Sequence, residues 1–359
     1  MTAPFAATVC SNFLQYTPYG ERMRTRDNKP VIAVSNGDPA GIGAEIVLKA
    51  LTDTELRALC APVVIGNPDV YTRDLHMAGI PLTLKVLNSL KDAEGKPGTV
   101  EILAFDRLDL SRCPMGQVSA EGGRYSGLCA IKSIELAMNG EAHAAVIAPN
   151  NKKAMSDGGH EHTGFEEMSR HSTGAERSIQ ILIGKTYKMA RVTNHVPLAK
   201  VPSLCTKERV LSAIRMLHNS LIMLGYPSPV VGVSGLNPHN GEGGLIGDEE
   251  MLHIGPACEE ARAECIRVVG PIPADTVFHD VKKFGLDVVL SMYHDHGNSN
   301  IKLLEFGNVA NFIGGLPVPV FTVAHGTAFD LAGKGVADAA NMRFSLASAA
   351  RAVRQGTYG

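Results

Sequence analysis

Two stretches near the C-terminal end carry the residue types best suited to chemistry. One is SMYHDHG at residues 291–297, and the other is HGTAFDLAGKG at residues 325–335. Each follows a short apolar, β-branched run, which is typical of a buried strand. The imidazole and carboxylate groups of the first stretch are metal-ligand types. The second combines backbone N–H groups and a flat imidazole with a helix start, which suits a nucleotide.

Histidines end two of the strands predicted from the sequence. Thr193-Asn194-His195 ends one of them, and His294 follows another. Neutral imidazoles from separate loops make a divalent-metal site with open positions for substrate oxygens, although a lone histidine is more often structural. The His-Glu-His triplet at 160–162 cannot share one helical face, but it could bind a metal from a loop.

Further polar loops follow predicted strands in the N-terminal half and the middle of the chain. The sequence NGDPAGIG at 36–43 has glycines for a tight turn and a helix start that could bind an anion, but a plain turn explains it equally well. It is neither GxGxxG nor a P-loop. Lys152 could bind a carboxylate or polarise a carbonyl, or could simply be solvated. The segment NPHNGE at 237–242 fits ligand binding or a turn.

Apolar runs of strand type alternate with stretches of helical periodicity, which predicts an α/β fold with a largely parallel sheet. The predicted strands are 30–35, 62–65, 144–148, 179–183, 189–193, 230–234, 288–292 and 318–323. The predicted helices include 44–51, 127–138, 207–224, 248–263 and 339–354.

Composition narrows the class of protein. The 359 residues, 45% of them hydrophobic and 19% charged, fit an enzyme with a substantial core. A net charge of −2 gives no electrostatic reason to expect nucleic acid or an acidic membrane as partner. No run approaches the roughly 20 apolar residues of a membrane span. Seven cysteines without CxxC spacing favour a reducing cytoplasm over a disulfide framework.

Taken together, these segments resemble the 4-hydroxythreonine-4-phosphate dehydrogenase family of pyridoxal phosphate biosynthesis and its catabolic relatives. The resemblance runs from about residue 30 to the end of the chain. The matching pieces are GDPAGIG (37–43), APNNK (148–152), TNH (193–195), NPHNGEGGLIGDEE (237–250), DTVF (275–278), YHDHG (293–297), Lys302, Asn311 and HGTAFDLAGKG (325–335).

The resemblance implies a homodimer with two α/β/α domains per subunit and a cleft between them, as in isocitrate and isopropylmalate dehydrogenases. The expected domains are a cofactor-side domain at 30–150 plus 305–359, and a central domain at 151–304 with the dimer interface and the metal site. Residues 1–29 read as an N-terminal extension.

The resemblance also implies the reaction and the residues that perform it. NAD would oxidise a secondary alcohol β to a carboxylate, decarboxylation would follow, and a divalent metal such as Zn, Mg or Mn would bind the substrate oxygens. The implied roles are as follows: His195 and His294 bind the metal, Lys302, Asp295 and Lys152 are catalytic, Asn151, Lys302 and Asn311 bind substrate, and His325, Gly326, Thr327, Ala328 and Asp330 bind the cofactor.

Three departures from the family bear on the substrate. Phe165 replaces the third metal histidine, so either His160 or His162 substitutes for it or the metal is weak or absent. Val320 replaces an arginine of the vitamin B6 enzymes, which removes a donor suited to phosphate or carboxylate, and Ala324 replaces an aspartate. These losses resemble the catabolic branch, which includes the terephthalate cis-dihydrodiol dehydrogenases.

The leading hypothesis is therefore a cytoplasmic, NAD-dependent decarboxylating dehydrogenase of a cis-dihydrodiol carboxylate from aromatic catabolism. The alternative substrate is 4-phosphohydroxy-L-threonine or another 4-phosphorylated sugar acid. A binding protein that has lost its metal and its activity is a hypothesis of a different class. Lys302, Asp295 and the complete loop at 325–335 argue against it.

Overall fold

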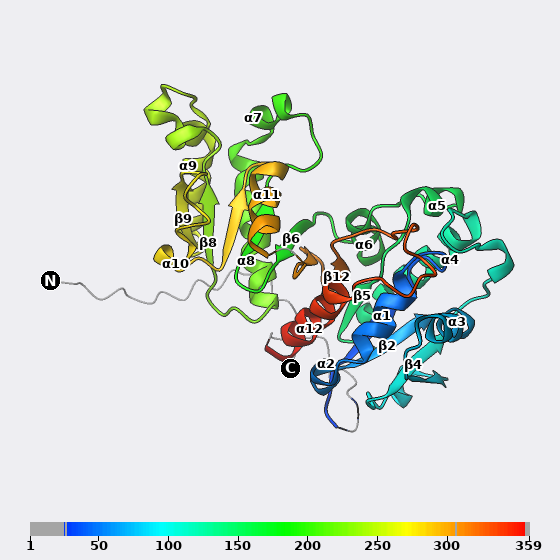
Figure 1. The fold of residues 1–359 in the computed structure, drawn as a ribbon. Helices are drawn as coiled ribbons and strands as arrows, with labels where there is room; N and C mark the ends of the chain where they lie inside the picture. Colours follow the sequence, from blue (N-terminus) through cyan, green and yellow to red (C-terminus); the bar gives the residue numbers. More distant parts are fainter. Residues whose placement is uncertain (1–24, 26, 306, 356–359) are drawn as a thin grey trace.

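A single twelve-stranded sheet runs through both lobes of the protein (Figure 1). The structure, a computed structural model, describes residues 25, 27–305 and 307–355. The predicted extension at 1–29 lies almost wholly outside them. The α/β class expected from the sequence is confirmed. Among the described residues, no helix combines the length and the apolarity needed to cross a bilayer.

The first lobe is built around the β1–β5 half of the sheet. It contains β1 (Val31–Ser35), α1 (Gly43–Leu51), α2 (Thr54–Leu59), β2 (Ala61–Gly66), α3 (Pro68–Ala78), β3 (Thr83–Leu87), β4 (Thr99–Ala104), α4 (Ala120–Met138), β5 (Ala144–Ile147), α5 (Lys152–Asp157), α6 (Phe165–Thr173), β12 (Val320–Val323) and α12 (Ala340–Gln355).

The second lobe holds the remaining elements. It contains β6 (Ile179–Ile183), β7 (Lys188–Arg191), α7 (Val201–Leu204), α8 (Lys207–Met223), β8 (Val230–Ser234), the irregular turns Pro238–Gly244 and Glu250–Ile254, α9 (Gly255–Ala263), β9 (Arg267–Ile272), α10 (Val281–Phe284), β10 (Val288–Ser291), α11 (His294–Glu305) and β11 (Ala310–Gly314).

The sheet is parallel at both ends and antiparallel in the middle. Its strand order is β3-β4-β2-β1-β5-β12-β11-β6-β7-β10-β8-β9. The β12–β11, β11–β6 and β6–β7 pairs are antiparallel. Three reversals separate the two parallel groups, so the carboxyl ends of the strands form two sets of loops rather than the single edge of a wholly parallel sheet. The domain boundaries remain a prediction, because one sheet continues through both lobes.

Helices α5 and α6 follow residue 150, where the predicted boundary places the central domain, but both pack against α4 of the first lobe. Glycine makes the α4–α5 approach possible. A Cβ on Gly123 would lie 1.9 Å from the carbonyl carbon of Ala154. The crossing of α4 and α5 therefore fixes the start of α5, where Lys152 lies.

The stretch after β10 is a helix rather than the loop expected from its His, Asp and Gly content. Helix α11 begins at His294. Gly297 lets the first turns of the helix approach β7 closely, because a Cβ there would meet the Cε of Met189 at 1.8 Å and displace the end of that side chain. His294, Asn298 and Lys302 are spaced by four residues and share one side of this helix.

Candidate active site

His195 and His294 lie side by side. Their ring centroids are 5.4 Å apart. They meet because β7 and β10 are parallel neighbours, with Arg191 opposite Ser291, so that the loops after both strands leave the sheet together. His195 adopts a left-handed backbone conformation with φ 46°. The sequence-based pairing of these two histidines is therefore seen in the structure, although no metal ligation follows from it alone.

Both ring nitrogens of His294 have partners. Nδ1 lies 2.7 Å from Oδ1 of Asp295, and Nε2 lies 2.9 Å from Nδ2 of Asn298. The Asp295 side chain is 82% exposed, so it can orient the imidazole while remaining in contact with solvent. Asn298 is buried and lies one helical turn after His294.

Charged groups from both lobes surround the His195 ring. Burial lowers the pKa of His195, and the nearby His294, Arg191 and Lys152 lower it further, while Glu166 acts in the opposite sense. Lys152 of α5 and Glu166 of α6 are therefore close enough for their charges to act on the ring. A neutral imidazole is the form that ligates a metal or accepts a proton.

Arg191 occupies the end of β7 beneath this pair. Its Nε donates to Oδ1 of Asn194 at 2.9 Å, its Nη1 to Oδ1 of Asn298 at 3.0 Å, and its Nη2 to Oε1 of Gln180. Burial lowers the pKa of Arg191. The guanidinium thus links the loop that carries His195 to helix α11, which begins at His294.

The predicted substrate-binding residues lie on three different elements. Asn151 caps α5 by accepting the N–H of Ala154 at 2.9 Å, which fixes the exposed Lys152 at the first position of that helix. Asn311 of β11 donates to Oγ1 of Thr322 at 3.1 Å, while its buried Oδ1 has no partner among the described residues. Lys302 is exposed on α11, two turns beyond His294.

The predicted cofactor loop packs on the GDPAGIG loop of the first lobe. The N–H of Ile42 donates to the carbonyl of Thr327 at 3.1 Å, and a Cβ on Gly41 would meet that carbonyl at 2.9 Å. Nε2 of His325 is buried without a partner among the described residues, whereas nothing lies within 4 Å of a Cβ on Gly326. An unpaired imidazole nitrogen beside open backbone fits a nucleotide base, so these residues suit NAD.

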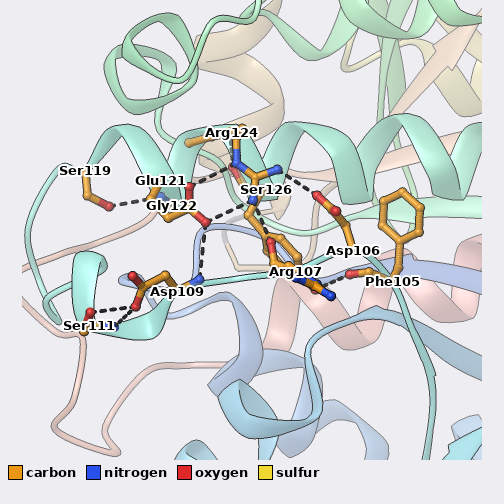
Figure 2. Close-up of polar contacts among 12 residues, drawn as sticks. Phe105, Asp106, Arg107, Asp109, Ser111, Ser119, Glu121, Gly122, Arg124 and Ser126 are labelled. Carbon is orange, nitrogen blue, oxygen red and sulfur yellow. Dashed lines mark hydrogen bonds and ion pairs between the residues drawn. The ribbon is translucent and has the colours of Figure 1, made fainter.

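A third loop supports the cofactor loop from the side. The N–H of Gly116 donates to the carbonyl of Ala40 at 2.8 Å, and a Cβ on Gly116 would contact the carbonyl of Phe329. Figure 2 shows how the segment leading to Gly116 is anchored: Arg124 of α4 binds Asp106, the Arg107 carbonyl and Glu121. The two loops at the carboxyl ends of β1 and β12 are thereby held together.

Neither candidate for a third metal ligand joins the histidine pair. Nε2 of His160 lies 2.8 Å from the carbonyl of Arg124, with its ring over Gly127, so its role is packing against α4. His162 stacks on His171 of α6, with ring centroids 4.6 Å apart. No group of three or more potential ligands occurs among the described residues. The pair therefore fits a divalent ion only as two of its ligands, with the other positions open.

Two of the residues used to infer the substrate belong to the core. Val320 is fully buried in an apolar cluster with Ala145, Ile147 and Ile313, and Phe165 packs against the same cluster. Packing explains both residues. The sequence-based inference concerned the loss of an arginine at position 320, and the burial of Val320 gives no evidence that this position contacts a substrate.

Comparison with known proteins identifies the family. The model of the pyridoxal phosphate biosynthetic protein PdxA family matches residues 58–349. This chain belongs to that family. It is 38% identical over 332 residues to the 4-hydroxythreonine-4-phosphate dehydrogenase of Geobacter metallireducens, covering 91% of this chain and 97% of that protein. It is 37% identical over 320 residues to a Symbiobacterium thermophilum protein named "Putative D-threonate 4-phosphate dehydrogenase", covering 89% and 96%.

Solved structures of this PdxA family share the fold. A 4-hydroxythreonine-4-phosphate dehydrogenase from Burkholderia phymatum superposes with a TM-score of 0.83 at 34% identity, covering 90% of this chain and 98% of that one. A terephthalate 1,2-cis-dihydrodiol dehydrogenase from Burkholderia xenovorans is more distant, with a TM-score of 0.64 at 28% identity, covering 87% and 95%. The chain is therefore a dehydrogenase, and the expected closeness to aromatic catabolism is not supported.

Several site residues escaped the sequence analysis. Arg191, Asn194, Asn298 and Glu166 contact or act on the histidine pair, and the sequence predicted a role for none of them, although Asn194 lies in the TNH motif. Two signals were available in the sequence. Arg191 is a charged residue at the end of a buried strand, and Asn298 lies one helical turn after a candidate ligand. Neither signal predicts which residues the side chains of Arg191 and Asn298 contact.

Proposed function

We propose that this protein oxidises a four-carbon 3-hydroxy acid that carries a phosphate on C4, of the hydroxythreonine or threonate type. The observation that carries the proposal is that relatives with these two activities in their names match about nine-tenths of the chain. The cationic side chains near the histidine pair, Lys152 and Arg191, suit a substrate with two acid groups. A terephthalate-type dihydrodiol also carries two acid groups, so the names of the relatives, and not these cations, favour the phosphate ester.

NAD bound at residues 325–330 would supply the hydride acceptor, and a divalent ion held by His195 and His294 would supply a Lewis acid. Burial and the neighbouring cations lower the pKa of His195, which favours the neutral, ligating form of this ring. Asp295 orients the His294 ring through Nδ1, and Nε2 would have to exchange its contact with Asn298 for the ion. Lys152 and Lys302 bind the acid groups of the substrate, together with Asn151 and Asn311.

The proposed reaction has two steps, oxidation of the alcohol and then decarboxylation. The alcohol carbon loses a hydride and its hydroxyl a proton, which leaves a β-keto acid. Loss of CO2 then breaks the bond to the carboxyl carbon, and the carbon left behind takes up one proton. Lys152 and Lys302, as ammonium groups, are suited to stabilise the enolate oxygen and to return that proton.

The protein is further proposed to act as a homodimer. Eight large apolar side chains are exposed among the described residues of the second lobe: Leu198, Leu245, Ile246, Met251, Leu252, Phe284, Leu303 and Leu304. Four of them, Leu245, Ile246, Met251 and Leu252, lie within residues 245–252, and a group of exposed apolar side chains is typical of a surface that pairs with another protein. A second copy of the chain is the partner that the family resemblance favours.

The substrate is tested by following NADH formation with added Zn²⁺, Mg²⁺ or Mn²⁺. Three substrates are compared: 4-phosphohydroxy-L-threonine, D-threonate 4-phosphate and the terephthalate cis-dihydrodiol. We expect turnover of at least one phosphate ester and a far lower kcat/KM for the dihydrodiol. Preferential oxidation of the dihydrodiol would refute the proposal and restore the catabolic hypothesis.

A further inference from the structure

Arg191 is a buried cation without a counter-charge. The residue is 7% exposed, and none of the described carboxylates lies within 4.0 Å of its guanidinium nitrogens. The acid whose charge acts on it, Glu166, instead accepts a hydrogen bond from Oγ of Ser178 at 2.9 Å. Burying an unpaired charge is costly, so such a group is normally neutralised by an anion.

The partners of Arg191 are neutral amides. Gln180, Asn194 and Asn298 each accept one hydrogen bond from it. A guanidinium has five N–H donors in a fixed fork, so two remain for another acceptor. The three amides come from β6, the loop after β7 and α11. They fix the plane of the guanidinium without neutralising its charge.

Other arginines of the chain show what a structural role looks like. Arg124 is paired with Asp106 and Glu121, and Arg215 with Glu264. Arg57, which is 1% exposed, donates to the backbone carbonyls of Lys96 and Thr99 and lies near the charge of Glu101. Arg191 differs because two of its partners, Asn194 and Asn298, lie on the segments that carry His195 and His294.

A pocket opens beside Arg191. It has a volume of about 510 Å³ and is also lined by Arg170, Arg177, Ser178 and Arg209. This volume is ample for the oxyanion end of a small phosphorylated acid, whereas neither His195 nor His294 lines the pocket. The acidic residues Glu166, Glu176 and Glu208 also line it, so the pocket is not uniformly positive.

We propose that Arg191 is a specificity-determining residue that binds an oxyanion group of the substrate through its two remaining N–H donors. This inference deepens the proposed function and rests on it for the identity of the substrate. The oxyanion is the phosphate or the carboxylate of the same molecule, since both match the guanidinium fork. Binding the oxyanion gives the buried guanidinium its counter-charge beside the histidine pair.

Steady-state kinetics with the phosphorylated substrate test the role in turnover. Arg191→Met is expected to raise KM about 10- to 100-fold with a smaller change in kcat, because a charge-assisted pair is lost. Arg191→Lys keeps the charge without the fork and should lie between Met and wild type. Arg215→Met, an exposed control, should leave both constants unchanged. An unchanged KM in a folded Arg191→Met variant overturns the proposal, and if that variant does not fold, wild-type KM in Arg191→Lys does so.

A binding measurement separates this inference from the proposed function. Calorimetry with inorganic phosphate and with malonate needs no turnover. Loss of phosphate binding in Arg191→Met assigns the phosphate group, and loss of malonate binding assigns the carboxylate. If wild type binds an anion in an Arg191-dependent way but oxidises neither phosphate ester, only the proposed substrate fails. If wild type binds neither anion, or the variant binds both normally, the inference fails.

Discussion

The histidine pair and the predicted cofactor loop occupy separate places in the candidate site. His294 faces His195, whereas the 325–330 loop rests on Ile42 and Gly41 of the first lobe. The proposed roles in substrate orientation and in cofactor binding therefore fall on different residues, and substitutions can test them separately.

His294→Ala should abolish turnover while leaving NAD affinity nearly intact, because this imidazole would orient substrate through the metal and does not touch the cofactor loop. The measurements are kcat and a calorimetric Kd for NAD. His279→Ala is a matched control, since His279 also pairs with the following aspartate but is 87% exposed. An unchanged kcat in His294→Ala would refute the metal role.

His325→Ala should have the opposite effect and weaken NAD binding about 10-fold or more. The buried, unpaired Nε2 of His325 is the polar atom available to a nucleotide base. Calorimetry of NAD binding is again the measurement. Wild-type NAD affinity in this variant would mean that residues 325–330 do not form the nucleotide site.

Asp38 predicts a pH dependence of stability. Burial raises its pKa to about 6 although its carboxylate accepts the N–H of Ala40. The folded state therefore binds more protons than the unfolded chain between pH 3.8 and about 6. The stability contributed by the neutral carboxyl is present below this window and is lost as the pH rises through it.

Asp38→Asn removes this titration. Relative to wild type, the variant should gain on the order of 1–3 kcal/mol in unfolding free energy between pH 4 and pH 8. Urea unfolding at both pH values measures the change. The difference between the pH values is the relevant quantity, because the new amide alters stability equally at both. Parallel profiles for the two proteins would contradict a raised pKa.

At the scale of elements, the α4–α5 crossing positions Lys152, the proposed catalytic lysine. Gly123→Ala should lower the unfolding free energy by about 2–4 kcal/mol, because the added Cβ overlaps the backbone of Ala154 at 1.9 Å and the helices must separate. Thermal unfolding followed by circular dichroism measures this. Glu135→Ala, at an exposed position of the same helix, should leave the Tm within a few degrees. A Gly123→Ala variant as stable as wild type would show that the crossing is loose.

For the whole molecule, the exposed apolar side chains of the second lobe predict self-association. Leu245→Glu with Leu252→Glu should convert a dimer into a monomer in analytical ultracentrifugation, because both side chains are more than half exposed in the isolated chain and would be buried in the pair. Val86→Glu, an equivalent change at an exposed position of the first lobe, should leave the dimer intact. A monomeric wild-type protein would refute the prediction.

The local sequence pattern alone determined many of the strands and helices and several candidate site residues. The apolar runs at 179–183 and 230–234 predicted β6 and β8 with their observed bounds, and helical spacing predicted α8 to within one residue. His195, His294 and the 325–335 loop could be found because polar residues directly after buried strands stand out from their surroundings. The same motifs identified the family.

The tertiary structure decided the rest, because contacts between distant residues have no local signature. Val320 is fully buried in the core. His160 contacts the carbonyl of Arg124 on α4. His294 begins a helix rather than a loop. Three antiparallel pairings joined the two parallel groups into one sheet. In the sequence, Arg191 looks like an ordinary strand residue. Only the fold shows that its hydrogen-bond partners are three side-chain amides.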